Sequence, residues 1–251
     1  MNLRRRSLLA AGLALPWISA TPGVSQTPRI EVMRFSALEA GSALPDWLLP
    51  WAFADQPRHT RYSLVKNEGT VVLRAQANAS TSGLVRQVRV DLRTHPVLAW
   101  RWKPQNLVVR GDLARKEGDD FALRVYVTFD LDPSALPAGE RLKLSLARML
   151  YGDRVPYAAL CYVWDARALR GTIVPNAYTD RVRMLVAESG TERVGRWVQV
   201  ERNVREDYVR AFGHTETVAP VPEVNGVIVS TDTDNTGESV EAFYGDIEFR
   251  A

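Results

Sequence analysis

The chain has 251 residues, of which 46% are hydrophobic, 24% are charged and one is a cysteine. This composition excludes a disordered or low-complexity protein, which would lack the apolar residues for a core, and a single cysteine excludes an intramolecular disulfide. Residues 1–20 contain three arginines and no acidic residue, so the remaining chain has 29 basic and 29 acidic side chains, and its charge gives no support for a nucleic-acid partner.

The first 20 residues are typical of an export signal peptide. Arginines at positions 4–6 precede an apolar stretch at residues 8–15, and small residues follow at 19–20. The arginines and the Gly- and Ala-diluted apolar stretch also resemble a twin-arginine signal, with an ordinary secretory signal as the alternative. The stretch is too short to span a bilayer. We therefore expect a periplasmic or secreted bacterial protein with no integral membrane segment after signal removal.

Alternation of apolar and polar residues, which is typical of strands, dominates the rest of the chain. It is clearest at residues 121–129, where Val125 and Phe129 fall on one face and Arg124 and Tyr126 on the other. In chain order, the alternation predicts strands at residues 30–35, 60–66, 70–77, 84–92, 97–102, 121–129, 159–164, 181–188, 197–201, 226–231 and 242–249.

Only two segments have helical spacing of apolar residues, residues 139–150 and residues 204–212, and the second is followed by Gly213. Many short strands bounded by turn residues, with little helix between them, predict a mainly β protein. We expect a two-sheet antiparallel jelly-roll-like sandwich with one or two short helices. Residues 28–251 are expected to form this single domain.

The acidic segment near the C-terminus matches half of a calcium-binding loop. Asp232, Asp234 and Thr236 alternate before Gly237, as do the first ligands of such loops. The position at which an EF-hand has its bidentate glutamate holds a phenylalanine, so an EF-hand is excluded. Glu238 or Asp246 would have to complete the coordination shell of the calcium ion. The segment therefore has two interpretations, a metal-free acidic hairpin turn, which Asp-Asn-Thr-Gly forms readily, and a structural calcium site.

Asp119 and Asp120 precede the strand that contains Arg124. A glycoside hydrolase needs two carboxylates that flank the same glycosidic bond. Adjacent residues of a strand, however, point to opposite faces of the sheet. Only one of the two could be catalytic, with Asp165, Asp232 or Asp246 as its partner. The alternative is a turn in which these carboxylates cap backbone amides or pair with Arg124.

Three further residues are candidates for ligand binding. Trp164 and Asp165 end a predicted strand, where an indole and a carboxylate could bind a sugar together; the alternative for the tryptophan is the core. Asn176 belongs to a polar segment that leads into another strand and could serve a polyol, or could lie in a solvated loop. The ligand-binding candidates are thus Asp119, Asp120, Arg124, Trp164, Asp165 and Asn176.

Established catalytic motifs are absent from the sequence. It has no Gly-x-Ser-x-Gly elbow, P-loop or dinucleotide fingerprint, and its three histidines lack the spacing of zinc ligands. Cys161 alternates with small apolar residues and is expected to be a buried, unreactive thiol.

Five distinctive short segments are spread along the chain. They are Gly118-Asp119-Asp120-Phe121-Ala122, Leu160-Cys161-Tyr162-Val163-Trp164, Asn176-Ala177-Tyr178-Thr179, Asp207-Tyr208 with Ala211-Phe212-Gly213, and the acidic segment with Tyr244-Gly245-Asp246-Ile247. Together they resemble the uncharacterised bacterial family catalogued as domain of unknown function 3047. The resemblance implies an exported protein of unassigned activity, so it supplies no catalytic residue. The strand pattern also resembles carbohydrate-binding jelly rolls at the level of fold.

Three functions remain in view. The first is a β-sandwich that binds a carbohydrate or envelope glycan without turning it over. The second is a polysaccharide hydrolase or lyase that uses carboxylates such as Asp119 and Asp165. The third is a structural or assembly factor of the cell envelope, which would expose a flat apolar patch.

Overall fold

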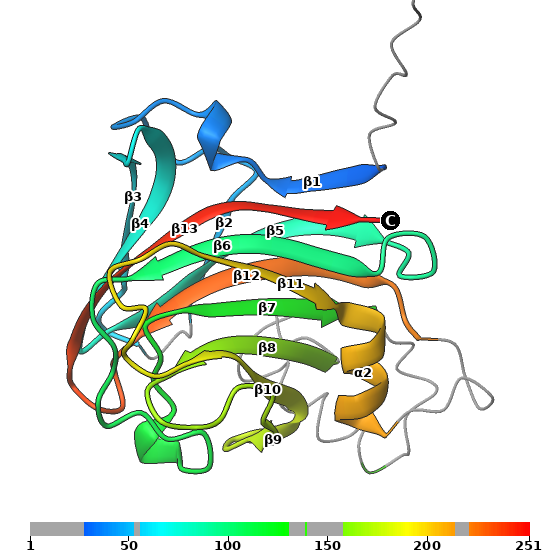
Figure 1. Cartoon of the computed structure of the whole chain (residues 1–251). Helices are drawn as coiled ribbons and strands as arrows, with labels where there is room; N and C mark the ends of the chain where they lie inside the picture. The colour runs from blue at the N-terminus through cyan, green and yellow to red at the C-terminus, as the bar shows by residue number, and fades with distance from the viewer. Residues whose placement is uncertain (1–27, 53–55, 131–138, 140–157, 214–220) are drawn as a thin grey trace, which may run out of the picture.

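The computed structural model describes residues 28–52, 56–130, 139, 158–213 and 221–251. These residues form two stacked β-sheets with their core between them (Figure 1). The mainly β sandwich expected from the alternation is confirmed. Of the two expected helices, residues 204–212 form α2 (Val204–Phe212), whereas residues 140–150 lie outside the described residues.

Sheet A contains six strands. Its order is β11 (Val198–Asn203), β6 (Val97–Pro104), β13 (Ser239–Arg250), β4 (Thr70–Asn78) and β3 (Arg61–Asn67). β1 (Arg29–Met33) pairs with the last residues of β13, so the C-terminus lies beside the first described strand (Figure 1). All its strand pairs are antiparallel.

Sheet B contains seven strands. Its order is β2 (Leu49–Trp51), β5 (Thr81–Val90), β12 (Val224–Asp232), β7 (Arg124–Phe129), β8 (Ala158–Asp165), β10 (Thr179–Ser189) and β9 (Ile173–Asn176). β8 and β10 are parallel, an exception to the expected antiparallel pairing. It arises because β9 forms the sheet edge and β10 turns back between β9 and β8, which gives it the direction of β8.

The core is rich in aromatic side chains that meet across the two sheets. The rings of Trp100 on β6 and Tyr162 on β8 have centroids 5.2 Å apart. Those of Trp102 and Trp164 are 6.2 Å apart. Trp164 is 1% exposed and donates its indole N–H to the carbonyl of Gly190. Its expected role in ligand binding is therefore wrong, because both ring faces are buried in the core.

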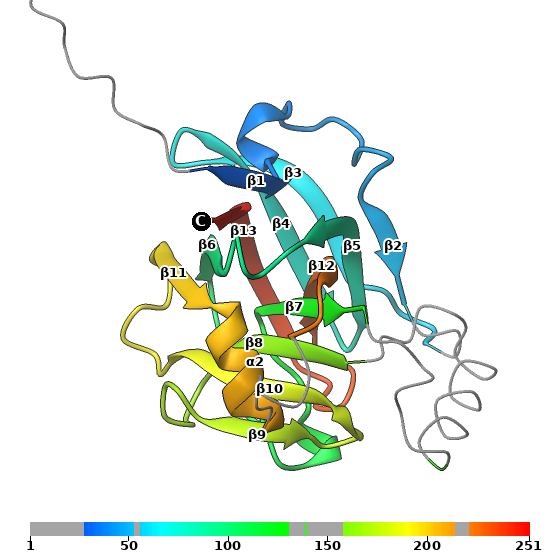
Figure 2. The same ribbon diagram turned by 90° about the vertical axis from the view of Figure 1, so that its right-hand side faces the viewer.

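α2 closes one end of the sandwich, where it contacts β6, β8 and β11 (Figure 2). It begins at Asn203, whose side chain accepts a hydrogen bond from the Glu206 amide, and ends at Gly213 in the left-handed conformation. Tyr208 packs its ring 4.7 Å from that of Phe129. No helix among the described residues is long and apolar enough to cross a membrane.

Candidate functional site

The buried guanidinium group of Arg124 lies at the centre of a polar cluster on the outer face of sheet B, the face turned away from sheet A. Arg124 begins β7, and strand alternation sends its neighbours Leu123 and Val125 into the core and its own side chain outward. The side chain is nevertheless only 1% exposed. A buried charge of this kind requires partners of opposite charge.

Arg124 has a hydrogen-bond acceptor for each of its five N–H donors. Nε and Nη2 bind the two carboxylate oxygens of Asp232, at 2.9 and 2.8 Å. Nη1 donates to Asp119 Oδ1 at 3.0 Å and to the Tyr126 hydroxyl at 3.2 Å, and Nη2 also donates to the Asp119 carbonyl. The expected pairing of Asp119 with Arg124 is confirmed. Such a saturated guanidinium holds two loops and a strand in one fixed geometry.

Asp119 and Asp120 precede β7, which begins at Arg124, so strand alternation does not separate them, and the Asp120 carboxylate lies beside that of Asp232. The carboxylate of Asp120 is fully buried and accepts hydrogen bonds from the amides of Asn235 and Thr236. These amides belong to the acidic turn between β12 and β13, which Gly237 allows with φ of +70°. Asp120 therefore fastens the loop before β7 to the hairpin turn that follows β12.

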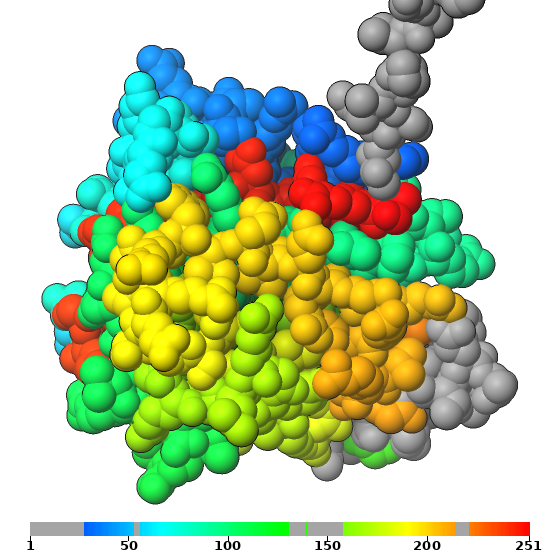
Figure 3. All heavy atoms as spheres, viewed as in Figure 1, coloured from blue at the N-terminus to red at the C-terminus, as the bar shows by residue number. Residues whose placement is uncertain are grey.

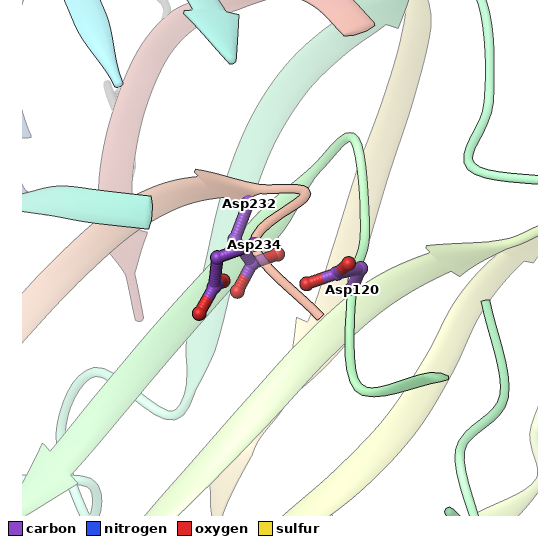
Figure 4. A group of neighbouring side chains, drawn as sticks. All are labelled: Asp120, Asp232 and Asp234. Atoms are coloured by element: carbon purple, nitrogen blue, oxygen red, sulfur yellow. The ribbon is translucent and has the colours of Figure 1, made fainter. Parts of the chain in front are cut away.

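Three carboxylates meet where this turn leaves β12. One oxygen each from Asp120, Asp232 and Asp234 lies within 4.8 Å of the other two (Figure 4). Gln56 donates to Asp234 Oδ2 at 3.1 Å, and the amide of Phe121 donates to Asp232 Oδ1 at 2.9 Å. We call Asp119, Asp120, Asp232 and Asp234 the carboxylate cluster.

The carboxylate cluster holds four acidic groups against one guanidinium group. Burial raises the pKa of Asp232 to about 7, with Asp120 and Asp119 adding to the shift and Arg124 opposing it. Burial and the neighbouring Asp120 also raise the pKa of Asp234. Both shifts have one physical cause, because negative charges brought together away from water favour protonation or a cation.

The other candidates from the sequence divide into those that join the cluster and those that do not. Asn176, at the end of β9, joins it by donating Nδ2 to Asp119 Oδ2 at 2.9 Å. Asp165 lies apart and accepts hydrogen bonds from the Arg167 and Ala168 amides, both at 2.6 Å. It caps the turn after β8, whereas Asp232, another of the partners expected for Asp119, binds the same guanidinium group as Asp119.

Thr236 and Glu238, two of the four expected metal ligands, are held by hydrogen bonds of their own. Both carboxylate oxygens of Glu238 accept backbone hydrogen bonds, from Val109 and Arg110, each at 2.9 Å. The Thr236 hydroxyl accepts from the Glu238 amide at 3.4 Å, and its own amide binds Asp120. Of the residues expected at a metal site, Asp232 and Asp234 thus lie together with Asp120, which the sequence did not suggest as a ligand, while the Glu238 carboxylate is engaged by backbone amides.

Sequence reasoning did not single out Tyr178, which lies at the rim of the cluster. The residue is 54% exposed. Its hydroxyl accepts from Asn235 Nδ2 at 2.9 Å and donates to the Lys116 carbonyl at 3.3 Å, and the Lys116 ammonium is 5.1 Å from the ring centre. The sequence feature that could have pointed to Tyr178 is its position two residues after Asn176, in the turn between two strands.

Cys161 is a free thiol buried on β8, near Arg124. It is completely buried, and burial raises the pKa of its thiol to about 12. A thiol with that pKa is almost never ionised at neutral pH, and the expected burial of this cysteine is confirmed.

Comparisons with known proteins identify a family without an assigned activity. Residues 46–248 match the family model DUF3047, described as a protein of unknown function. A search of curated proteins gave no match. Among solved structures, the chain is similar to the glycoside hydrolase domain Spr0440, Endo-D, from Streptococcus pneumoniae R6, with 8% identity and a TM-score of 0.34. The match covers 81% of this chain and 21% of that one. At that score the likeness supports no functional conclusion.

Proposed function

The chain belongs to the DUF3047 family of proteins of unknown function, and we propose that it is a carbohydrate-binding protein whose site is the rim of the carboxylate cluster. One observation carries the proposal: the exposed ring of Tyr178 stands beside a fixed set of carboxylate and amide groups. Residues 1–20 direct export in this proposal, so the glycan would belong to the envelope or to the surroundings of the cell.

The rim has the two kinds of group that bind a sugar. An aromatic face packs against the apolar side of a pyranose ring, and Tyr178 offers such a face, which is held in place by the hydrogen bonds of its hydroxyl. Carboxylates and amides bind the hydroxyl groups of the sugar. Asp234 is only partly buried, and Asn176 and Asn235 lie on either side of Tyr178 in the hydrogen-bond network.

Binding without turnover fits the state of the carboxylates. The two oxygens of Asp119, of Asp120 and of Asp232 all accept hydrogen bonds from protein donors. A general acid must give up a proton to the substrate, and groups engaged in this way are poorly placed to reach one. The same rigidity favours binding, because less conformational entropy is lost when the site is already ordered.

An apolar docking surface, as a structural envelope factor would need, has less support. The exposed large hydrophobic residues among those described are Leu49, Val109, Leu169 and Tyr178, and they come from four separate segments of the chain. Four exposed residues are few for the contiguous apolar patch that marks such surfaces.

Glycan-array screening tests the proposal. We expect the purified protein to bind a subset of neutral envelope or plant glycans, and Tyr178→Ala to lose roughly tenfold or more in affinity, as losing one stacked ring does. Leu169→Ala, which changes an exposed residue in the loop after β8, is the control and keeps full affinity. Absence of any ligand below millimolar concentration, or equal binding by Tyr178→Ala, would contradict the proposal.

A calcium ion at the carboxylate cluster is the second candidate, and it has its own observation. Three carboxylates offer oxygens within 4.8 Å of one another, and four acidic groups share one guanidinium partner. Ca²⁺ takes carboxylate and carbonyl oxygens in flexible geometry. In this role the ion would fix the acidic turn beside Tyr178, and its effect on unfolding distinguishes it from a cluster that is merely protonated.

A further inference from the structure

A row of side chains crosses the outer face of sheet A, the face turned away from sheet B. Strand register places Ser63 opposite Arg74, Arg74 opposite Phe243, and Phe243 opposite Lys103. Trp197 precedes β11 and extends the row by one position, with its ring 6.5 Å from that of Phe243. In the view of Figure 3 the residues that lead into β11, coloured yellow, lie at the surface.

Lys103 organises this row and is already neutralised. Its ammonium lies 5.3 Å from the ring centres of both Trp197 and Phe243. It donates to Asn67 Oδ1 at 2.6 Å and to Glu68 Oε1 at 2.8 Å. The lysine therefore fixes the two rings and leaves no unbalanced charge of its own.

Arg101 is held on the same face by packing. It lies two residues before Lys103 on β6, and its guanidinium carbon is 4.5 Å from the centre of the Trp197 ring. Its stem lies over Gly245, where a Cβ atom would be 2.4 Å from Arg101 Cγ. The glycine thus makes room for the arginine, and the tryptophan sets its direction.

The guanidinium groups of Arg101 and Arg74 have no carboxylate partner within the described part of the chain. Arg74 donates Nε to Ser63 Oγ at 3.3 Å, and Arg101 only stacks on Trp197. On β13, Glu241 accepts a hydrogen bond from Gln76 and Asp246 accepts one from the Ser36 amide. Both arginines are partly exposed.

We propose that this row binds the carboxylate groups of an acidic polysaccharide that crosses the strands of sheet A. A guanidinium group binds a carboxylate through two parallel hydrogen bonds, and one that is already stacked loses little freedom on binding. Arg74 and Arg101 lie on strands separated by β13, about 10 Å apart across the sheet, so they can hold two carboxylates of one chain. The choice of a glycan rests on the proposed function, but the site differs in place and in charge from the rim at Tyr178.

Polygalacturonate and its fully methyl-esterified form are the probes, because they differ only in the charge of the uronate groups. We expect affinity electrophoresis of the full protein to show retardation by the acidic polymer alone, and the retardation to weaken as salt screens the charges. Arg74→Gln and Arg101→Gln should each weaken binding roughly tenfold. Arg170→Gln, an exposed arginine in the loop after β8, should change nothing, and melting curves verify that each variant folds.

The variant Tyr178→Ala separates this proposal from the proposed function. Retardation by polygalacturonate that survives Tyr178→Ala but not Arg101→Gln supports a second site on sheet A. Equal retardation by the esterified polymer, full binding by the double variant of Arg74 and Arg101, or binding to anionic phospholipid vesicles in place of the polymer would overturn it. Loss of neutral-glycan binding in Tyr178→Ala would support the proposed site at the rim and would leave the proposal for sheet A unchanged.

Discussion

The guanidinium group of Arg124 and the carboxylate of Asp232 meet side by side, with Nε–Oδ1 at 2.9 Å and Nη2–Oδ2 at 2.8 Å, where β7 begins and β12 ends. Both residues are buried. The two strands are neighbours in sheet B, so this ion pair ties the end of the sheet to the loop that carries Asp119 and Asp120.

Replacing Arg124 with methionine should be strongly destabilising. The change leaves Asp119 and Asp232 buried without a counter-charge, and breaking a buried pair by removing one partner costs about 3–5 kcal/mol. For a domain of this size that corresponds to a melting temperature lower by roughly 6–20 °C. Differential scanning calorimetry measures it.

The control for this change is Arg29→Gln, which removes an exposed ion pair with Glu31 and should alter stability by less than about 1 kcal/mol. A loss of stability in Arg124→Met no larger than in the control would mean that the cluster does not hold the loops together.

Stability should fall as pH rises from about 4 to 7. The folded-state pKa of Asp232 is about 7 because of burial and neighbouring carboxylates, whereas the unfolded value is near 3.9. Between those two pKa values the native state binds more protons than the unfolded state. The free energy of unfolding is therefore highest at low pH and decreases as the pH rises to about 7. The shift of Asp234 acts in the same direction.

Urea unfolding at pH 5, 6, 7 and 8 in the presence of a chelator tests this dependence. Asp232→Asn cannot ionise at this position, so its midpoint should vary less with pH than that of the wild type. Parallel pH profiles for the two proteins would show that Asp232 stays ionised throughout, held by Arg124.

Trp164 and Tyr178 should separate stability from binding. Trp164→Phe removes buried ring area and the hydrogen bond to Gly190, so we expect it to lose about 1–3 kcal/mol of stability and to keep its affinity for glycans. Tyr178→Ala should show the reverse pattern. Chemical unfolding and a glycan-binding titration on the same preparations measure both quantities, and a loss of affinity in Trp164→Phe would restore the tryptophan as a binding residue.

Alternation of residues predicts most of this fold because one face of each long strand is buried. It missed β2 and β9, which are three and four residues long and each contain a proline, Pro50 and Pro175. Segments so short have no periodicity to detect. The parallel pairing of β8 and β10 was also missed, since the order of strands in a sheet is set by the whole chain.

The site was predictable where its residues are close in sequence and unpredictable where they are not. Asp232 and Asp234 are signalled by the turn they begin, and the pairing of Asp119 with Arg124 spans five residues. The contact of Asp120 with the Thr236 amide spans 116 positions. The Glu238 carboxylate binds amides 128 and 129 positions away, which is why a reading of the local motif assigned it to the metal.

Calcium should stabilise the protein if the carboxylate cluster holds the ion. With a dissociation constant of about 10 μM, 1 mM calcium adds roughly 2.7 kcal/mol, which raises the melting temperature by several degrees. Calcium binds the ionised carboxylates, so it should also abolish the fall in stability between pH 5 and 7. Thermal unfolding in calcium and in chelator measures both effects.

Two variants decide which residues hold the ion. Asp234→Asn removes one of the three converging carboxylates and should abolish the calcium shift, whereas Glu238→Gln should keep it, because Glu238 binds the Val109 and Arg110 amides outside the cluster. Loss of the shift in Glu238→Gln alone would favour the ligand set read from the turn motif. With no calcium shift in the wild type, Arg124 and proton uptake by the cluster would offset the carboxylate charge instead, and the rim at Tyr178 would have to bind its glycan without a metal ion.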